Sequence, residues 1–187
     1  TLQQSSAASD VYKRQTLHQL QRSQRMLGFL FDTIDYSDPY DPAGGAETIQ
    51  AILQHGLTEA KVQFAENDSL RAQVLSRLGI ALSHRGAAEK ALPALLEASR
   101  LLEQASPPNW QELARTNNFI GRTYLYLDDL DTAELWLLKS IQQAQKASAP
   151  ETLEQQAIAY NDLGRLYDLK GDLTQQRQSF QAAYALD

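Results

Sequence analysis

Apolar residues recur along the chain at the spacing of an amphipathic helix. Leu75, Leu78 and Leu82 stand three and four positions apart, and segment 160–167 repeats this spacing. Residues spaced in this way share one helix face, so each set predicts one buried stripe. The pattern predicts helices over residues 17–35, 46–66, 70–85, 88–104, 111–127, 132–147, 151–169 and 173–186.

The predicted helices are separated by breaks rich in proline, glycine and capping residues. Pro and Gly interrupt segment 36–45, and Pro interrupts segments 105–109 and 148–151. Asn109, Asp131 and Asp172 are each followed three positions later by Glu or Gln. A short polar side chain at this spacing is typical of a helix N-terminus, so each of the three is predicted to cap a helix.

Glycines recur at a nearly constant interval in the second half of the chain. Gly79, Gly121 and Gly164 lie 42 and 43 residues apart, and each follows an Ile or Leu. Sixteen positions after them stand Leu95, Leu137 and Phe180. This register predicts a repeated pair of antiparallel helices in which glycine allows close approach and the larger residue fills the seam.

Turn residues are found where each pair needs a reversal. Gly86 and Gly171 follow the first helix of two pairs, and segment 128–130 follows it in the middle pair. Such pairs bury their faces only by stacking on one another. We therefore expect an all-α fold, with helix-turn-helix repeats stacked in a right-handed superhelical solenoid.

Composition narrows the function classes. The chain has 187 residues, 43% of them hydrophobic, with a formal net charge of -6 and no Cys. The acidic balance argues against binding to nucleic acid or to an anionic membrane, and the lack of Cys excludes disulfides and Cys-ligated zinc. No stretch approaches the roughly 18 consecutive apolar residues of a transmembrane helix.

Residues 1–15 stand apart from the rest. The run SSAASDVYKRQ over residues 5–15 resembles the peptide obtained when sequencing-adapter DNA is translated. We expect a non-native leader here and exclude it from the fold prediction. We also expect the natural chain to be longer than the sequence given.

The repeated small-residue and aromatic pattern resembles the tetratricopeptide repeat, in the longer variety found in kinesin light chains and bacterial signalling proteins. Three units match, over residues 70–104, 111–147 and 151–187, after a helical lead-in over residues 16–69. Leu75 and Asn117 depart from the Trp or Tyr frequent in the family, and Gln176 departs from its Ala. The resemblance implies a non-catalytic module that binds proteins or peptides.

The lead-in resembles the region before the repeats of bacterial membrane-anchored serine/threonine kinases. The matching positions are Phe29, Leu30, Phe31, Asp38, Pro39 and Thr48. The resemblance implies the sensory or docking part of such a kinase, while the alternative is a regulatory repeat domain of a bacterial transcription regulator or a general scaffold protein. The kinase Gly-rich loop, His-Arg-Asp and Asp-Phe-Gly motifs do not occur, so no kinase activity is expected of this chain. The compartment stays open between the cytoplasm and the outer side of a membrane.

Candidate binding residues lie on the first helices of the pairs. If the repeat geometry holds, positions two before and two after the apolar seam face a concave groove. Those positions are Asn118 and Arg122 in the second unit and Asn161 and Arg165 in the third, with Arg115 and Tyr126 on the same wall. An ordinary solvated helix face is the alternative for each single residue.

The resemblance implies that an Asn at this position hydrogen-bonds an extended peptide backbone, since an amide side chain both donates and accepts. Arg adds a charge-assisted contact, so we expect a partner with an acidic side chain or a C-terminal carboxylate. Phe180 and Tyr184 on the last predicted helix raise self-association as a further possibility.

No catalytic, cofactor or metal site is predicted. His18, His55 and His84 fall on separate predicted helices without metal-ligand spacing. Asp128 and Asp129 fall in a turn, where Asp commonly caps helices.

Overall fold

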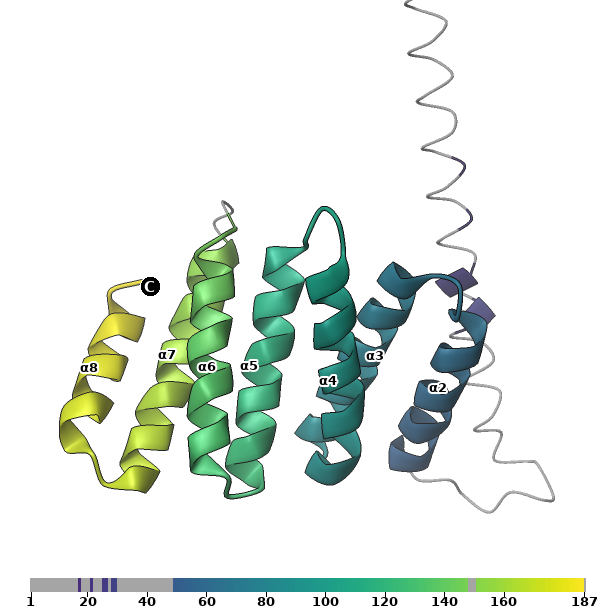
Figure 1. Cartoon of the computed structure of the whole chain (residues 1–187). Helices are drawn as coiled ribbons and strands as arrows, with labels where there is room; N and C mark the ends of the chain where they lie inside the picture. Colours follow the sequence, from purple (N-terminus) through teal and green to yellow (C-terminus); the bar gives the residue numbers. More distant parts are fainter. Residues whose placement is uncertain are drawn as a thin grey trace, which may run out of the picture. The chain divides into compact units, whose positions relative to one another are not determined.

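The computed structural model describes residues 49–147 and 151–186, together with positions 17, 21, 25, 26, 28 and 29. Seven α-helices and no strand occur over the described residues (Figure 1). They are α2 (Ile49–Gln63), α3 (Asp68–His84), α4 (Ala88–Gln104), α5 (Trp110–Tyr126), α6 (Leu130–Ala144), α7 (Glu151–Lys170) and α8 (Leu173–Tyr184). None of the helices described is long and apolar enough to cross a membrane.

The seven helices lie within three residues of the bounds that the sequence predicts. The eighth expected helix, over residues 17–35, falls largely outside the described residues, as do Leu30, Phe31, Asp38, Pro39 and Thr48. An all-α fold is thus confirmed for the part of the chain that the structure describes.

Two of the three expected N-caps are confirmed and one is wrong. The side-chain oxygens of Asn109 and Asp172 accept from backbone N–H groups at the starts of α5 and α8. Helix α6 begins earlier than expected, because Asp129 accepts from the Thr132 N–H at 3.1 Å. Asp131 is therefore inside the first turn, and its carboxylate binds Lys170 instead.

The chain divides into two compact units, residues 1–59 and 60–187. In the second unit α3 packs on α4, α5 on α6 and α7 on α8, and the pairs follow one another side by side (Figure 1). The second helix of one pair packs on the first helix of the next. First helices also contact one another, α3 with α5 and α5 with α7, so they form a shared wall.

Close approach at glycine joins the two helices of each pair. A Cβ built on Gly79 would lie 2.8 Å from Leu95 Cγ, and one on Gly121 would lie 2.7 Å from Leu137 Cγ. A Cβ built on Gly164 would lie 2.5 Å from a carbon of the Phe180 ring. These separations are too short for a second carbon, so the sixteen-residue register of the sequence is a contact in each pair.

The reversal after each first helix uses a left-handed backbone. Gly86 and Gly171 have φ of 74° and 73°, and Asp128 holds the corresponding position with φ of 61°. In all three turns the next N–H donates to the carbonyl five residues earlier, as in a Schellman motif. Glycine adopts this conformation without strain, whereas Asp128 adopts it at some cost.

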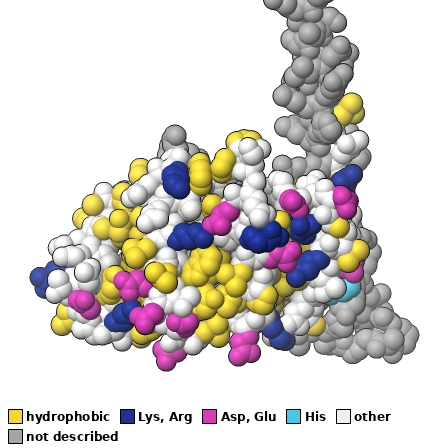
Figure 2. Space-filling model, in the orientation of Figure 1, with side chains coloured by type: hydrophobic (Ala, Val, Ile, Leu, Met, Phe, Trp, Pro, Cys, Tyr) yellow, Lys and Arg dark blue, Asp and Glu magenta, His cyan; other side chains and the backbone are white. Residues whose placement is uncertain are grey.

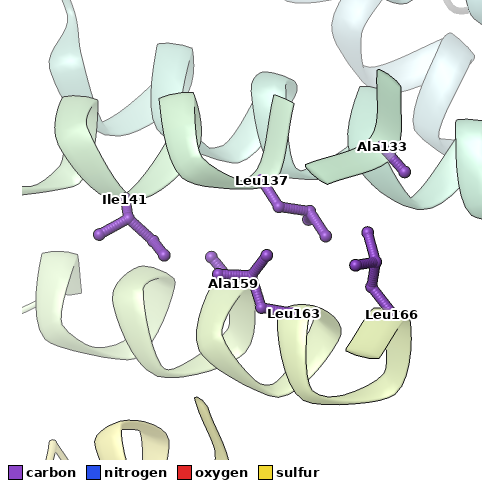
Figure 3. Close-up of a cluster of buried hydrophobic side chains, with 6 residues drawn as sticks. All are labelled: Ala133, Leu137, Ile141, Ala159, Leu163 and Leu166. Carbon is purple, nitrogen blue, oxygen red and sulfur yellow. The ribbon is translucent and has the colours of Figure 1, made fainter. Parts of the chain in front are cut away.

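Apolar packing between α6 and α7 joins the second pair to the third. Figure 3 shows three side chains from α6 facing three from α7. The six buried residues are Ala133, Leu137, Ile141, Ala159, Leu163 and Leu166. Leu137 belongs both to this cluster and to the contact with Gly121, so one side chain links packing within a pair to packing between pairs.

Polar groups fix the register of α6 on α7 at the edge of this cluster. Lys170 Nζ donates to Asp131 Oδ1 and Glu134 Oε2, each at 2.7 Å, and the Tyr167 hydroxyl donates to Glu134 Oε1 at 2.6 Å. Hydrogen bonds from Lys170 lower the pKa of both carboxyls. Burial, with the Glu134 contact, raises the pKa of Tyr167 to about 12. Because the carboxyl pKa values are lowered, this stabilisation is present above their usual range and is lost as the pH falls below it.

Replacing Gly121 with Ala tests the close approach. The new Cβ meets fully buried Leu137 at 2.7 Å, so we expect the free energy of unfolding to fall. Overpacking costs about 1–3 kcal/mol, more than the roughly 1 kcal/mol that Ala gains over Gly in a helix. Urea denaturation followed by circular dichroism measures the change.

The matched control is Gln142→Ala, at an exposed position of α6. Its free energy of unfolding should change by less than about 0.5 kcal/mol. A Gly121→Ala variant more stable than the parent would contradict the proposed constraint.

Candidate functional site

A hollow of about 420 Å³ lies on the wall formed by α5 and α7. From α5 it is lined by Arg115, Asn118, Phe119 and Arg122, among others, and from α7 by Glu154, Gln155 and Ile158. Arginine, amide and apolar side chains therefore face the same space. The Arg122 guanidinium also lies 5.0 Å from the centre of the Phe119 ring, a cation–π arrangement.

A second hollow, of about 220 Å³, adjoins the first through Arg122. Its other lining residues are Leu125, Tyr126, Arg165 and Leu169. Arg122 from α5 and Arg165 from α7 thus bring two positive charges to a pocket whose remaining walls are apolar or aromatic. We name the two hollows together the α5–α7 groove.

Asp162 lies beneath the two arginines and is 5% exposed. Its carboxylate accepts a hydrogen bond from Asn118 Nδ2 at 3.1 Å. Arg122 Nε and Arg165 Nη1 lie 3.8 and 3.7 Å from its oxygens. Burial raises the pKa of Asp162 above its usual range, and Arg122, the Asn118 amide and Arg165 oppose that rise.

Five of the six predicted site residues line the groove: Arg115, Asn118, Arg122, Tyr126 and Arg165. Asn118 is only 1% exposed, and its amide donates to Asp162. One N–H of the Asn118 amide is therefore already used within the protein, and a contact of Asn118 with a bound peptide stays a prediction. Asn161 is exposed on α7 and lines neither hollow.

The two asparagines differ in burial. Both occupy the same position of the repeat, and this position faces the first helix of the following pair. In the first pair the same position is Ser76, which is buried and contacts Thr116 at 2.9 Å on α5. Asn118 reaches Asp162 on α7 in the same way. Over the described residues no further first helix follows α7, so Asn161 is left on the surface. A prediction made from the pattern of a single repeat misses this difference in burial, because the residue that contacts the asparagine belongs to the following repeat.

Sequence reasoning also missed Asp162. It stands next to Asn161 and directly before the apolar seam residue Leu163, a position too close to the core for an unpaired acid. That placement is the signal that could have singled it out. Finding its arginine partners needed the packing of α5 on α7.

The described residues include no group of three or more His, Asp or Glu side chains that could hold a metal ion. His84 lies with its ring edge to face against Phe119, with ring centres 5.2 Å apart. His55 lies on α2, and His18 lies outside the described residues.

The surface around these helices carries mixed charge. Figure 2 shows Lys and Arg side chains next to Asp and Glu side chains, with hydrophobic ones between them. The net charge of -6 therefore does not prevent a locally basic pocket such as that of Arg122 and Arg165.

Comparison with known proteins finds matches to family models and to solved structures. Residues 70–146 match one model described as tetratricopeptide repeat, and residues 157–187 match another with the same description. The crystal structure of BtubC (BKLC) from P. vanneervenii is similar, with a TM-score of 0.61 and 18% identity. The match covers 73% of this chain and 56% of that one, and at this identity it shows the fold alone. No curated protein matches.

Replacing the two asparagines separately tests their different environments. Asn118→Ala removes the amide that donates to buried Asp162, so the free energy of unfolding should fall by about 1–3 kcal/mol. Asn161→Ala alters an exposed side chain and should change the free energy of unfolding by less than about 0.5 kcal/mol. Urea denaturation at neutral pH measures both, and equal losses would contradict the different roles assigned to them.

Proposed function

This chain belongs to the tetratricopeptide repeat family, whose models match residues 70–146 and 157–187, and from that premise we propose that its α5–α7 groove binds a protein partner through an extended peptide segment. Tetratricopeptide repeats indicate a protein-interaction module. The observation that carries the proposal is the pair of adjoining hollows that share Arg122.

The lining of the groove supports an extended peptide. A peptide in this conformation leaves its backbone N–H and C=O groups unpaired, and it needs donors and acceptors from the protein. Gln111 and Gln155 on the two walls of the larger hollow supply both. Leu125, Tyr126 and Leu169 in the smaller hollow offer apolar surface to an alternating side chain.

The charges of the groove favour an acidic partner. Arg115, Arg122 and Arg165 line it, and a guanidinium forms two parallel hydrogen bonds with a carboxylate. Among the lining residues of the two hollows the one acidic side chain is Glu154, and buried Asp162 lies close to Arg122 and Arg165. A partner with an acidic side chain or a C-terminal carboxylate suits this arrangement.

A display library of linear peptides tests the proposed function. Peptides selected on the whole chain should bind at least about tenfold more weakly to Tyr126→Ala and to Arg115→Ala, because both side chains line the groove. The thermal midpoint should stay unchanged, since Tyr126 is exposed and Arg115 is half-buried. Isothermal calorimetry measures the affinities.

Gln142→Ala on α6 is the control, because it removes an exposed polar side chain away from the groove. Peptides that bind all three variants as tightly as the parent would place the binding site elsewhere and refute the proposal.

At the level of the whole protein, we propose the sensory or docking region of a bacterial serine/threonine kinase. The support is the resemblance of the segment that leads into the repeats, of which the structure describes Phe29, a buried residue. A regulatory domain of a transcription regulator or a scaffold protein is the alternative. Either protein would use the groove in the same way.

The coding sequence upstream of this chain distinguishes the two. We expect it to encode a Gly-rich loop, a His-Arg-Asp motif and an Asp-Phe-Gly motif, followed by an apolar membrane segment. An upstream helix-turn-helix DNA-binding domain would favour the regulator and contradict the kinase proposal.

Self-association through α8 stays a prediction. Phe180 and Tyr184 on this helix are 38% and 84% exposed. Phe180 already packs on Gly164 within its own pair, so the face offered to another copy is small.

A further inference from the structure

The arginines of the smaller hollow hold unused hydrogen-bonding capacity. Arg122 Nε and Arg165 Nη1 lie 3.8 and 3.7 Å from the Asp162 oxygens, which is close enough for charge attraction but too long for a hydrogen bond. Arg122 Nε is buried and has no hydrogen-bond partner among the described residues. A buried N–H without an acceptor is costly, so Arg122 is not fully satisfied within the protein. The Nε itself is closed to a ligand, so an incoming acceptor would meet the parts of Arg122 and Arg165 that line the hollow.

The walls of the pocket restrict what that acceptor can be. Leu125, Tyr126 and Leu169 surround the two guanidinium groups, and the volume of about 220 Å³ suits one or two side chains rather than a large ligand. A carboxylate beside an apolar residue complements both features. The adjoining larger hollow continues the groove beyond Arg122, so the chain of a bound peptide has space past this point.

We propose that the pocket of Arg122 and Arg165 receives an acidic side chain within an extended peptide, and that Asp162 sets its affinity as a resident competitor for the same two arginines. The inference rests on the proposed function of the groove. Asp162 and the incoming carboxylate carry the same charge next to the same cations. Part of the attraction of the arginines is therefore already used by the protein itself.

This competition couples binding of the peptide to the uptake of a proton. Two carboxylates near one pair of cations repel, so the bound state favours protonation of one of them, and Asp162 already has a raised pKa. Binding raises that pKa further, so the complex takes up a proton and its affinity increases as the pH falls. The increase ends where the ligand's own carboxyl titrates, near about pH 4.3 for Glu.

Other ionisable groups lie on the elements packed around Asp162. On α6, Asp131 and Glu134 bind Lys170 of α7, and Lys139 pairs with Glu103 of α4 at 2.6 Å. The α8 helix carries Arg177, and His84 of α3 contacts Phe119 at the larger hollow. His84 is a second ionisable side chain at the groove, so the experiment must separate it from Asp162.

The substitution Asp162→Asn makes this separation. Asn keeps the size of the side chain and an oxygen that accepts from Asn118, but it removes the charge, and His84 is untouched. The probes are three synthetic peptides: Ser-Leu-Glu-Leu-Ser capped at both ends, the same peptide with Gln for Glu, and Ser-Leu-Gln-Leu with a free C-terminal carboxylate. Titration of the isotope-labelled whole chain, followed by NMR, measures their dissociation constants.

We expect the parent chain to bind the Glu peptide more tightly than the other two. Asp162→Asn should tighten the Glu peptide by on the order of tenfold near neutral pH and leave the Gln peptide unchanged. As the pH is lowered from neutral toward the usual range of a carboxyl group, the parent's affinity for the Glu peptide should rise, while that of Asp162→Asn stays level. Asp168→Asn, which removes an exposed charge from the same helix, should match the parent.

Three results would overturn the inference. Weaker binding of the Glu peptide by Asp162→Asn would show that Asp162 positions the arginines rather than competing for them. Equal affinity for the Glu and Gln peptides would show that the pocket takes no acidic side chain, and preference for the free C-terminus would assign the arginines to a terminal carboxylate.

Failure of the inference and failure of the proposed function remain distinguishable. Display selection that yields groove-binding peptides without acidic residues would refute this inference alone. Failure of every selected peptide to respond to Tyr126→Ala and Arg115→Ala would refute the function itself. The pH dependence of the parent chain is measured without any substitution, so the test does not depend on the folding of one variant.

Discussion

The contact of a glycine with a large side chain sixteen residues later is the constraint on which the rest of the fold depends. It fixes how closely the helices of each pair approach, at Gly79, Gly121 and Gly164. The distance within a pair then determines how far Leu137 extends toward α7, and so how the second pair stacks on the third. The α5–α7 groove exists because this stacking places two first helices side by side.

Buried polar residues on the first helices follow from the same geometry. Small residues within each pair bring helices close enough for short side chains such as Ser76 and Thr116 to meet between neighbouring pairs. In the next interface the corresponding contact joins Asn118 to Asp162 and places a carboxylate under Arg122 and Arg165. The electrostatics of the candidate site thus arise from an interface between repeats.

The helices and their pairing were predictable from the sequence because they depend on local periodicity. Glycine spacing also predicted which side chains meet within a pair, and the contacts at Leu95, Leu137 and Phe180 confirm it. The start of α6 was not predictable from caps alone, since Asp129 and Asp131 are both suitable and Lys170, far along the chain, binds the second. The environment of Asn118 was missed for a related reason, because its partner lies 44 residues away in another helix pair.

Matching contacts between successive pairs give the array a fixed order. Ser76 on α3 meets Thr116 on α5, whereas Asn118 on α5 meets Asp162 on α7. If the middle pair were deleted, Ser76 would face the helix that carries Asp162. The Ser76 hydroxyl would then stand in place of the Asn118 amide, and Asp162 would also lose the nearby charge of Arg122. The pairs share one backbone plan, yet they are not interchangeable modules, and shortening or shuffling this array would leave a buried acid with fewer partners.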